Sequence, residues 1–423
     1  MSPAPILVVG GGASGIFAAI GAAERGAPVV LLEKNRYLGR KLLLTGNGRC
    51  NLTNTAPLDL LIQQFSENGP FLYSALANFS NRDVIHFFDR LDVPLKEERG
   101  GRVFPASNRS KDVQAALTFY LRKLGVQVEL NTKVCGISVK GNRVNGVFTE
   151  RRFMPAEAVI LATGDLSYPR TGSTGDGYCW ARELEHTVTP LRPSLVPLET
   201  AEPWVRELSG LALTDVLVTA WSQQQKVGEE RGEMLFTHFG LSGPAILTLS
   251  RSVVRALEKG PVQVLLNLRP SQDLEALDRQ LVHHLSGHGA KQLKNALQDF
   301  VPRKLVSIVL ALSELDPHLP AHQLPRERRR LARTLQALPL TVNRARPIAE
   351  AMVTSGGICL REVNPKPMAS KLVANLYFAG EILDIDGFTG GFNLQAAFST
   401  GYLAGQSAAL AIKKREGETD ARQ

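Results

Sequence analysis

The sequence has few cysteines and no long apolar segment, and each shortage excludes a class of protein. Only four of its 423 residues are cysteines. Cys50, Cys135, Cys179 and Cys359 lie far apart without a CxxC pair, so neither a disulfide scaffold nor a metal cluster is expected. No stretch approaches the ~20 apolar residues of a membrane span. The first residues show no secretory signal, so we expect a cytoplasmic protein without membrane contact.

The composition that remains is that of a globular protein with excess positive charge. Hydrophobic residues make up 44% of the chain and charged residues 21%. This apolar fraction excludes intrinsic disorder, because it can offset the entropy lost on folding. At one domain per ~100–200 residues, the length predicts two or three domains. The net charge of +9 favours an anionic partner without identifying it.

The order of the apolar segments predicts α/β structure at both ends of the chain. A strand over 5–9, an alanine-rich helix over 16–25 and a strand over 28–32 form a βαβ opening. Another buried strand is expected over 158–163, and a strand over 376–379 returns to the first pattern. We therefore expect both ends to pack into one discontinuous domain around a ligand.

Two insertions separate the halves of this domain. Residues 195–269 alternate between apolar and polar side chains, which is typical of an antiparallel sheet or barrel. Residues 272–336 have helical patterns, and a last helix is expected over 394–411.

A glycine-rich turn follows the first strand and opens the first helix. Gly10, Gly12 and Gly15 form GxGxxG, in which the glycines allow a tight turn, approach of a pyrophosphate and close helix packing, respectively. The helix N-terminus adds unpaired N–H groups and a positive dipole end. Glu33 ends the second strand, where a carboxylate can accept hydrogen bonds from ribose hydroxyls. The pattern predicts a dinucleotide site, and a βα turn without ligand is the alternative.

A second glycine-rich segment favours FAD over NAD. The strand over 376–379 ends in Gly380-Glu381, and Gly390 and Gly391 precede the last helix. A second helix N-terminus of this kind can stabilise the negative charge of a reduced flavin. The sequence has no further GxGxxG for a separate nicotinamide domain. We expect bound FAD, with NADPH or NADH as a transient reductant.

Several longer motifs together resemble a known family, the BaiN/YhiN-type NAD(P)/FAD-dependent oxidoreductases. The most specific is GRKLLLTGNGRCNLTN over 39–54, and the resemblance covers nearly the whole chain. The other motifs lie at 10–15, 162–164, 167–169, 171–178, 235–244, 354–357 and 380–395. One departure is Asp165, which stands where a second glycine often follows the Ala-Thr-Gly motif.

The resemblance implies a Rossmann-like, discontinuous FAD-binding domain with an inserted antiparallel β-barrel and a small helical domain. The predicted boundaries are 1–190 and 347–423 for the FAD-binding domain, 191–271 and 337–346 for the barrel, and 272–336 for the helical domain. The family includes a ribosomal RNA dihydrouridine synthase and a reductase of a steroid double bond in bile-acid metabolism. Some members carry the name aminoacetone oxidase.

The predicted cofactor-binding residues follow from these motifs, and the resemblance implies that the loop within 39–54 runs along the cofactor. Cations of this loop could neutralise a pyrophosphate, although a solvated basic loop is the alternative. The predicted set is Gly10, Gly12, Ala13, Ser14, Gly15, Glu33, Lys34, Arg40, Lys41, Thr45, Gly46, Asn47, Gly48, Val134, Ala162, Thr163, Gly164, Gly380, Glu381, Gly390, Gly391, Asn393 and Leu394.

Cys50 is the candidate general acid. Reduction of an activated C=C bond needs a hydride at one carbon and a proton at its neighbour, and a thiol protonated at neutral pH can supply that proton. A small packing residue near the cofactor is the alternative. Cys359 is a weaker candidate, and we expect Cys135 and Cys179 to be core residues. Three histidines, His283, His284 and His288, lack a carboxylate or cysteine that would complete a metal site, so no metal is expected.

An arginine-rich segment is the candidate surface for RNA. Residues 325–346 hold seven arginines and one glutamate. Arginine suits phosphates by its fork geometry and bases by stacking, whereas a solvated helix face with salt bridges is the alternative. The candidate contacts to RNA are Arg49, Arg326, Arg328, Arg329, Arg330 and Arg333.

These observations and the resemblance predict an FAD-dependent reductase that converts a uridine of large-subunit (23S) ribosomal RNA to dihydrouridine. A small-molecule C=C reductase or amine oxidase on the same scaffold is the main alternative. A non-catalytic, flavin-containing RNA-binding factor is the third.

Overall fold

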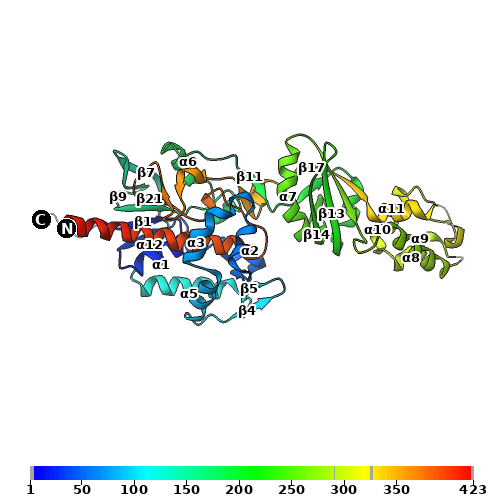
Figure 1. The fold of residues 1–423 in the computed structure, drawn as a ribbon, viewed down its shortest axis with the longest axis horizontal. Coiled ribbons are helices and arrows are strands. Elements are labelled where there is room, and N and C mark those ends of the chain that lie inside the picture. Colours follow the sequence, from blue (N-terminus) through cyan, green and yellow to red (C-terminus); the bar gives the residue numbers. More distant parts are fainter. Residues whose placement is uncertain (1–3, 290, 324–326, 421–423) are drawn as a thin grey trace. The chain divides into compact units, whose positions relative to one another are not determined.

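The computed structural model describes residues 4–289, 291–323 and 327–420, and they form two compact units (Figure 1). The α/β unit joins both ends of the chain, up to Arg192 and from Val353 onward, whereas the barrel unit is the segment Pro193–Met352. The parallel sheet, the closed barrel and the helices confirm the predicted fold class.

A seven-stranded sheet forms the centre of the α/β unit. Its strands β21, β10, β1, β2 and β6 run parallel, and β20 and β19 extend one edge in antiparallel pairs. In spatial order the strands are β19 (Val363–Asn364), β20 (Ala369–Ser370), β21 (Leu376–Phe378), β10 (Ala158–Leu161), β1 (Ile6–Val9), β2 (Val29–Leu32) and β6 (Gln127–Glu129). Strands β1, β2 and β10 are apolar and buried at every position, as is typical of parallel strands covered on both faces.

The register makes the central strands end level with one another. Val9, the last residue of β1, lies opposite both Leu32 of β2 and Leu161 of β10, and Leu161 lies opposite Phe378 of β21. The residues that follow these four strands therefore meet at one edge, which we call the carboxyl edge.

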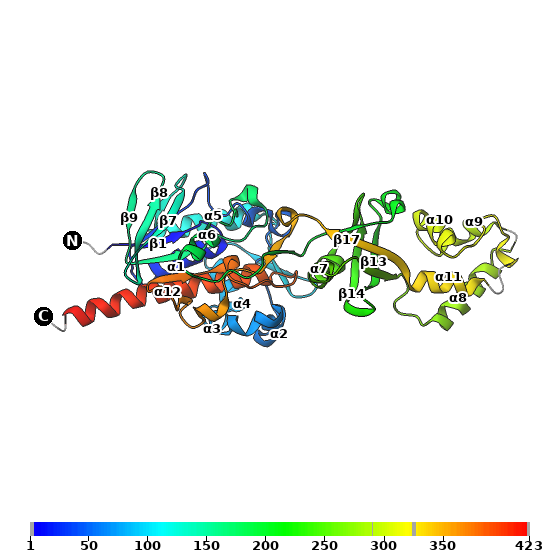
Figure 2. The same cartoon turned by 90° about the horizontal axis from the view of Figure 1, so that it is seen from above.

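Helices α1 (Ala13–Ala23) and α12 (Phe392–Asp420) lie side by side in both views (Figures 1 and 2). Their close approach requires small residues, because a Cβ atom at Gly401 would overlap the backbone oxygen of Ser14. Phe17 and Phe398 add a ring contact with centroids 4.4 Å apart. The last helix therefore covers the first, although they lie at opposite ends of the sequence.

The remaining elements of the α/β unit surround this centre. The other helices are α2 (Leu58–Gln63), α3 (Tyr73–Asn78), α4 (Asn81–Asp89), α5 (Ser110–Lys123) and α6 (Asp176–Glu183). Two small antiparallel sheets consist of β3 (Thr53–Asn54), β5 (Arg102–Pro105) and β4 (Leu95–Glu98), and of β7 (Val134–Lys140), β8 (Arg143–Thr149) and β9 (Phe153–Pro155). Strand β18 (Val353–Ser355) leads back into the unit.

A closed antiparallel barrel forms the first part of the barrel unit. Its strands, in spatial order, are β12 (Leu198–Thr200), β15 (Gly240–Ser242), β14 (Gln225–Phe236), β13 (Ala212–Ser222), β16 (Val262–Asn267) and β17 (Leu338–Ala345). Helix α7 (Pro244–Leu257) packs against β14. Alternate residues of β13 and β16 point into the core, which explains the alternating sequence pattern.

A helical segment lies between β16 and β17 in the sequence. It contains α8 (Leu274–Ser286), α9 (Leu293–Ala296), α10 (Arg303–Leu312) and α11 (Arg328–Gln336), which are grouped together in Figure 2. Helix α11 buries Leu331, Ala332 and Leu335 and contacts α8 and α10, so its arginines occupy the other faces.

Two sequence expectations are corrected. Cys135 and Cys179 are exposed, not core residues. Cys135 follows the buried Val134 and points to the other face of β7, while Cys179 lies on the outer face of α6, whose neighbours Tyr178 and Trp180 are buried. The last helix begins at Phe392 and continues to Asp420, beyond the expected 394–411. Among the described residues, no helix has the length and apolar character needed to cross a membrane.

Candidate functional site

The carboxyl edge collects most of the predicted cofactor-binding residues. Gly10 follows β1, Glu33 follows β2, the Ala162–Thr163–Gly164 motif follows β10, and Gly380 and Glu381 follow β21. Ligands of open α/β sheets bind outside the carboxyl ends of the strands, so this edge is the candidate site.

The three glycines of the GxGxxG turn have different surroundings. Gly10 has a φ of +106°, and a Cβ atom there would overlap the backbone oxygen of Ala162. A Cβ atom at Gly15 would overlap the backbone oxygen of Gly10, whereas one at Gly12 would meet no heavy atom within 4 Å. Gly10 and Gly15 therefore allow close packing, and Gly12 leaves open space in front of the helix.

The N-terminus of α1 opens toward this space. Gly12 is the N-cap residue and no side chain caps the helix, so Ala13 and its neighbours present N–H groups and the positive end of the helix dipole. Ser14 is buried, and a Cβ atom at Gly380 would overlap its hydroxyl oxygen. The end of β21 thus packs directly on the first turn of α1.

Glu33 is buried beside the glycine turn. Its Oε2 accepts a hydrogen bond from the Gly11 N–H at 2.7 Å, and its Oε1 accepts one from the Asn35 N–H at 2.7 Å. The side-chain amide of Asn35 donates a further hydrogen bond to Oε1 at 2.6 Å. A carboxylate offers about four acceptor positions, so Glu33 fixes the turn and keeps capacity for one more donor.

The segment 39–54 forms a tight turn near this edge. The stretch Leu42–Gly48 is a 3-10 helix interrupted by left-handed residues at Gly46 and Asn47, both with φ of 57°. Thr45 donates a hydrogen bond from its hydroxyl to the Leu42 oxygen at 2.7 Å. Gly48 is also left-handed, so the turn reverses the chain just before Cys50.

Two predicted cations have partners other than a ligand. Lys34 donates from Nζ to Asp176 Oδ2 at 2.6 Å and to the Thr174 hydroxyl at 2.5 Å. Arg40 donates from Nη1 to Asn35 Oδ1 at 2.6 Å. Both side chains therefore stabilise the protein around the site, and their contact with a cofactor stays a prediction.

Lys41 lies between two carboxylates at the carboxyl edge. Its Nζ is 2.8 Å from Asp165 Oδ1, 2.7 Å from Glu381 Oε2 and 2.6 Å from the Ser167 hydroxyl. Burial alone would lower the pKa of Lys41, but the charges of Asp165 and Glu381 outweigh it and raise the pKa. Asp165 and Ser167 were not predicted as site residues, although the missing glycine at 165 was the signal that could have found Asp165.

Cys50 is completely buried next to this turn. It has no exposed surface and a left-handed φ of 64°. Burial raises the pKa of its thiol to about 12, and a hydrogen bond with the Thr45 side chain lowers it in part. The thiol has no exposed surface from which a substrate could be reached, and its role as general acid stays a prediction. Cys359 is half-buried beyond Ile358.

The second glycine-rich segment closes over the same region. A Cβ atom at Gly391 would overlap the backbone oxygen of Thr53, and Asn54 donates from Nδ2 to the Gly390 oxygen at 3.1 Å. Asn393 exchanges two hydrogen bonds of 2.8 Å with the backbone of Gly387. These contacts join the loop before α12 to the segment 39–54, and Leu394 continues into the helix.

These groups fit a dinucleotide. The uncapped N-terminus of α1 and the space in front of Gly12 can receive a pyrophosphate, and Glu33 stands at the end of the adjacent strand, where a ribose would follow. Within the described ranges, the buried Thr163 hydroxyl lacks a hydrogen-bond partner. The fit to a dinucleotide does not depend on two other predicted cofactor-binding residues. Gly164 has a left-handed φ of +75°, and Val134 is buried at the start of β7.

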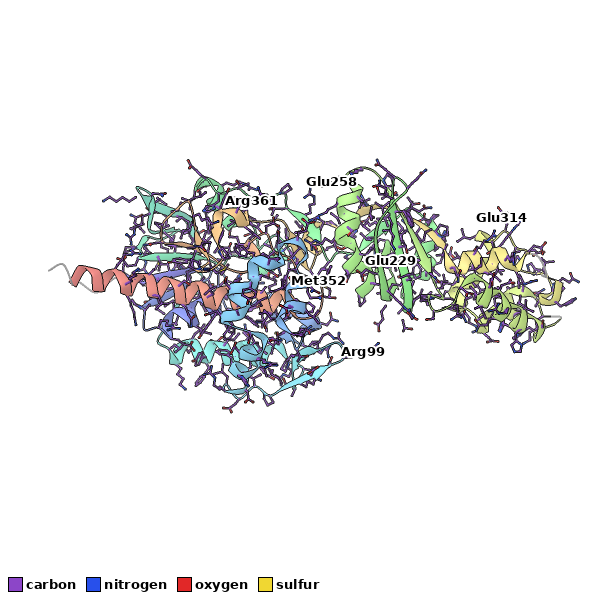
Figure 3. The ribbon with its side chains drawn as sticks, in the orientation of Figure 1. Arg99, Glu229, Glu258, Glu314, Met352 and Arg361 are labelled. Carbon is purple, nitrogen blue, oxygen red and sulfur yellow. The ribbon has the colours of Figure 1, made fainter. Side chains whose placement is uncertain are left out.

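The candidate RNA contacts lie in different places. Arg49 belongs to the α/β unit, where its guanidinium lies 4.1 Å from the Phe104 ring centroid and 3.0 Å from Glu98. Near it, the turn between β4 and β5 carries Arg99, labelled in Figure 3. Arg326 lies outside the described residues.

The four other candidate arginines lie on α11. Arg328 pairs with Asp278 of α8 at 3.0 Å. Arg330 pairs at 3.3 Å with Glu314, which follows α10 and is labelled in Figure 3. Arg329 and Arg333 are exposed and, among the described residues, have no acidic partner. Arginines with an acidic partner and exposed arginines without one among the described residues thus occur on the same helix.

The described residues contain no group of three or more His, Cys, Asp or Glu that could hold a metal ion. His284 contacts the Ala296 oxygen through Nε2 at 2.6 Å, and His288 contacts the His284 oxygen through Nδ1 at 2.8 Å. Their ring nitrogens therefore serve the local fold.

The parallel sheet, the open helix N-terminus and Glu33 define a dinucleotide-binding protein of the Rossmann class. A family model described as "HI0933-like protein Rossmann domain" matches residues 4–407. The chain belongs to this family of FAD-dependent oxidoreductases, which confirms the resemblance stated from the motifs.

Relatives with two different names match over almost the whole chain. A 3-dehydro-bile acid delta(4,6)-reductase of Clostridium scindens is 35% identical over 410 residues, 95% of this chain and 98% of the relative. A ribosomal RNA dihydrouridine synthase of Escherichia coli is 31% identical over 404 residues, 95% of this chain and 96% of the relative. Among solved structures, a 3-ketosteroid delta1-dehydrogenase of Sterolibacterium denitrificans superposes with a TM-score of 0.54 at 13% identity, covering 97% of this chain and all of that chain. The last likeness concerns the fold alone.

Proposed function

We propose that the protein is an FAD-dependent reductase that saturates a C=C bond. The observation that carries this proposal is that both relatives, each matched over 95% of this chain, have names that denote saturation of a C=C bond. Bound FAD supplies a hydride for such a reduction. The carboxyl edge has the groups that such a cofactor needs.

The chain's own residues hold the dinucleotide in this proposal. The N-terminus of α1 and Gly12 receive the pyrophosphate, and Glu33 accepts from a ribose hydroxyl. Lys41 and Glu381 lie beside the end of β21, which packs on the first turn of α1. NADPH or NADH is the proposed reductant.

We infer that the substrate is a uridine in large-subunit ribosomal RNA, which becomes dihydrouridine. The relative from E. coli supports this inference by its name. The exposed Arg329 and Arg333 support it because they can contact phosphates without breaking an ion pair within the described chain. A uridine must leave its stack to reach an enzyme site, which suits a single-stranded or flexible part of the RNA.

A small-molecule C=C reductase is the second candidate. It is favoured by one observation, the 35% identity to the bile-acid reductase, which exceeds the 31% identity to the RNA-modifying relative. An amine oxidase and a non-catalytic RNA-binding flavoprotein have no comparable observation behind them.

The deciding experiment is nucleoside mass analysis of large-subunit ribosomal RNA from cells with and without the gene. We expect deletion to remove one dihydrouridine, and the wild-type gene to restore it. A Glu33→Ala gene should restore less, because weaker FAD retention lowers the active fraction. An unchanged nucleoside profile would contradict the RNA substrate, and reduction of a steroid enone by NAD(P)H and the purified protein would then support the second candidate.

A further inference from the structure

The group of Lys41, Asp165 and Glu381 has more negative than positive charge. The side chains of Lys41 and Glu381 are 18% and 24% exposed, and that of Asp165 is fully buried. If both carboxyl groups were ionised, one ammonium would face two carboxylates and leave a charge of −1. Two carboxylates beside one ammonium repel each other, so the second negative charge costs more free energy than the first.

The hydrogen bonds distinguish the two carboxyl groups. Asp165 accepts from the Lys41 ammonium, from the N–H groups of Ser167 and Thr354 at 3.1 and 2.9 Å, and from the Ser167 hydroxyl at 2.8 Å. Glu381 accepts from Lys41 alone within the part of the chain that the structure describes. Several donors stabilise a carboxylate, so the geometry makes Asp165 the ionised member.

The groups around Glu381 act on its pKa in opposite directions. The hydroxyl of Tyr178, on α6, donates to the backbone oxygen of Glu381 at 3.2 Å. Burial raises the pKa of Glu381, Lys41 lowers it and Asp165 raises it, and the net shift is upward. Burial also raises the pKa of Tyr178, with contributions from Asp165, Glu381 and Asp384 that outweigh Arg182.

We propose that Glu381 holds a proton in the resting protein and that Asp165 is the positioning residue that keeps it there. Lys41 uses its three N–H bonds on Asp165, Ser167 and Glu381, which leaves the second oxygen of Glu381 to carry the proton. With Asp165 ionised, Lys41 charged and Glu381 neutral, the group has no net charge. This avoids the cost of an uncompensated buried charge.

The consequence concerns the supply of protons at the carboxyl edge. Saturation of a C=C bond consumes one proton besides the hydride, and Cys50 is sealed from solvent. Glu381 is partly exposed at the edge itself. The inference goes beyond the proposed function, because Glu381 would hold its proton whichever compound is reduced.

Infrared spectroscopy of the holoprotein, without substrate, tests the proposal. We expect the C=O stretch of a protonated carboxylic acid at neutral pH, and its loss in Glu381→Gln. Glu362→Gln is the matched control, because Glu362 accepts from the Thr187 N–H at 2.8 Å and its pKa is lowered despite some burial. The band should persist in that variant.

Two further variants test whether Asp165 and Lys41 shift the pKa of Glu381 in opposite directions. Asp165→Asn removes the negative neighbour, so the band should disappear at a pH at least about one unit lower than in the wild type. Lys41→Met removes the positive neighbour, so the band should persist to higher pH. A wild-type spectrum with no band sensitive to Glu381→Gln would overturn the proposal even if the enzyme reduces ribosomal RNA. A failed RNA experiment would leave this result unaffected.

Discussion

The carboxyl edge of the α/β unit and helix α11 of the barrel unit both concentrate charge, but they use it differently. At the edge, Lys41 and Asp165 are partly or fully buried, and their partners come from distant segments of the chain. On α11, Arg328 and Arg330 pair with acids of neighbouring helices, and Arg329 and Arg333 face outward. The difference teaches that a charge run in a sequence indicates an exposed surface, whereas the charges that build a site are isolated in the sequence.

The largest expected effect is the loss of a buried charge. Asp165→Ala should lower the free energy of unfolding by about 3–5 kcal/mol, because it leaves two backbone N–H groups without their acceptor and removes one of the two carboxylates that contact Lys41. Arg330→Ala, which breaks an exposed ion pair on α11, should cost about 0–1 kcal/mol. Urea unfolding of the three proteins measures both values. Equal losses in the two variants would remove the contrast between the regions.

Glycine substitutions separate packing from cofactor binding at the edge. Gly15→Ala should cost about 1–3 kcal/mol of stability and reduce FAD content, because its Cβ overlaps the Gly10 oxygen. Gly12→Ala should change the stability of the apoprotein by about 1 kcal/mol or less, since its Cβ meets only open space. It should still weaken FAD binding by obstructing the approach to the helix. Melting curves with and without FAD provide the measurement, and identical FAD affinity in Gly12→Ala would contradict the pyrophosphate site.

The buried thiol of Cys50 should make the folded protein less stable as the pH becomes alkaline. Its thiol has a pKa of about 12 in the folded protein, against 9.0 for an unperturbed thiol. The folded state therefore binds the proton more tightly, and the resulting stability is complete below pH 9 and is lost as the pH rises toward 12. The stability difference between the wild type and Cys50→Ala should fall by about 1 kcal/mol per pH unit above pH 9.

The control for this titration is Cys135→Ala. That cysteine is exposed, so the variant keeps the buried Cys50 thiol and its stability should change with pH as the wild type's does. Parallel curves for the wild type and Cys50→Ala would show that the buried thiol does not control alkaline stability.

Activity of Cys50→Ala with FAD bound tests its catalytic role separately, and a loss of ~100-fold or more is expected for a general acid.

The smallest effect on stability, and the greatest dependence on salt, is expected on α11. The double variant Arg329→Ala/Arg333→Ala should reduce the salt slope of RNA binding by about two units, one for each lost phosphate contact. Arg328→Ala/Arg330→Ala removes the same charge but takes arginines that already have acidic partners. This matched control should reduce the slope less. Equal slopes in both variants would assign the effect to net charge alone.

Local patterns in the sequence predicted the parts of the fold that depend on neighbouring residues. The strand, glycine turn and helix at the start are adjacent in the chain, and their spacing alone identifies a βαβ unit with Glu33 at the second strand end. The exposure of Cys135 and Cys179 was missed, because short strands and helices give too few residues to assign a face. Which arginines of α11 are paired was also beyond the pattern, since the acids belong to other helices.

The sequence by itself determined the α/β class, the glycine turn and the motifs of the family, because these depend on residues within about one turn or one strand of each other. Only the tertiary structure decided that Lys41 lies between Asp165 and Glu381, which are 124 and 340 positions away from it. No local pattern contains such a group. The group exists because β2, β10 and β21 end at the same edge of the sheet. This alignment of the strand ends depends on strand order and register.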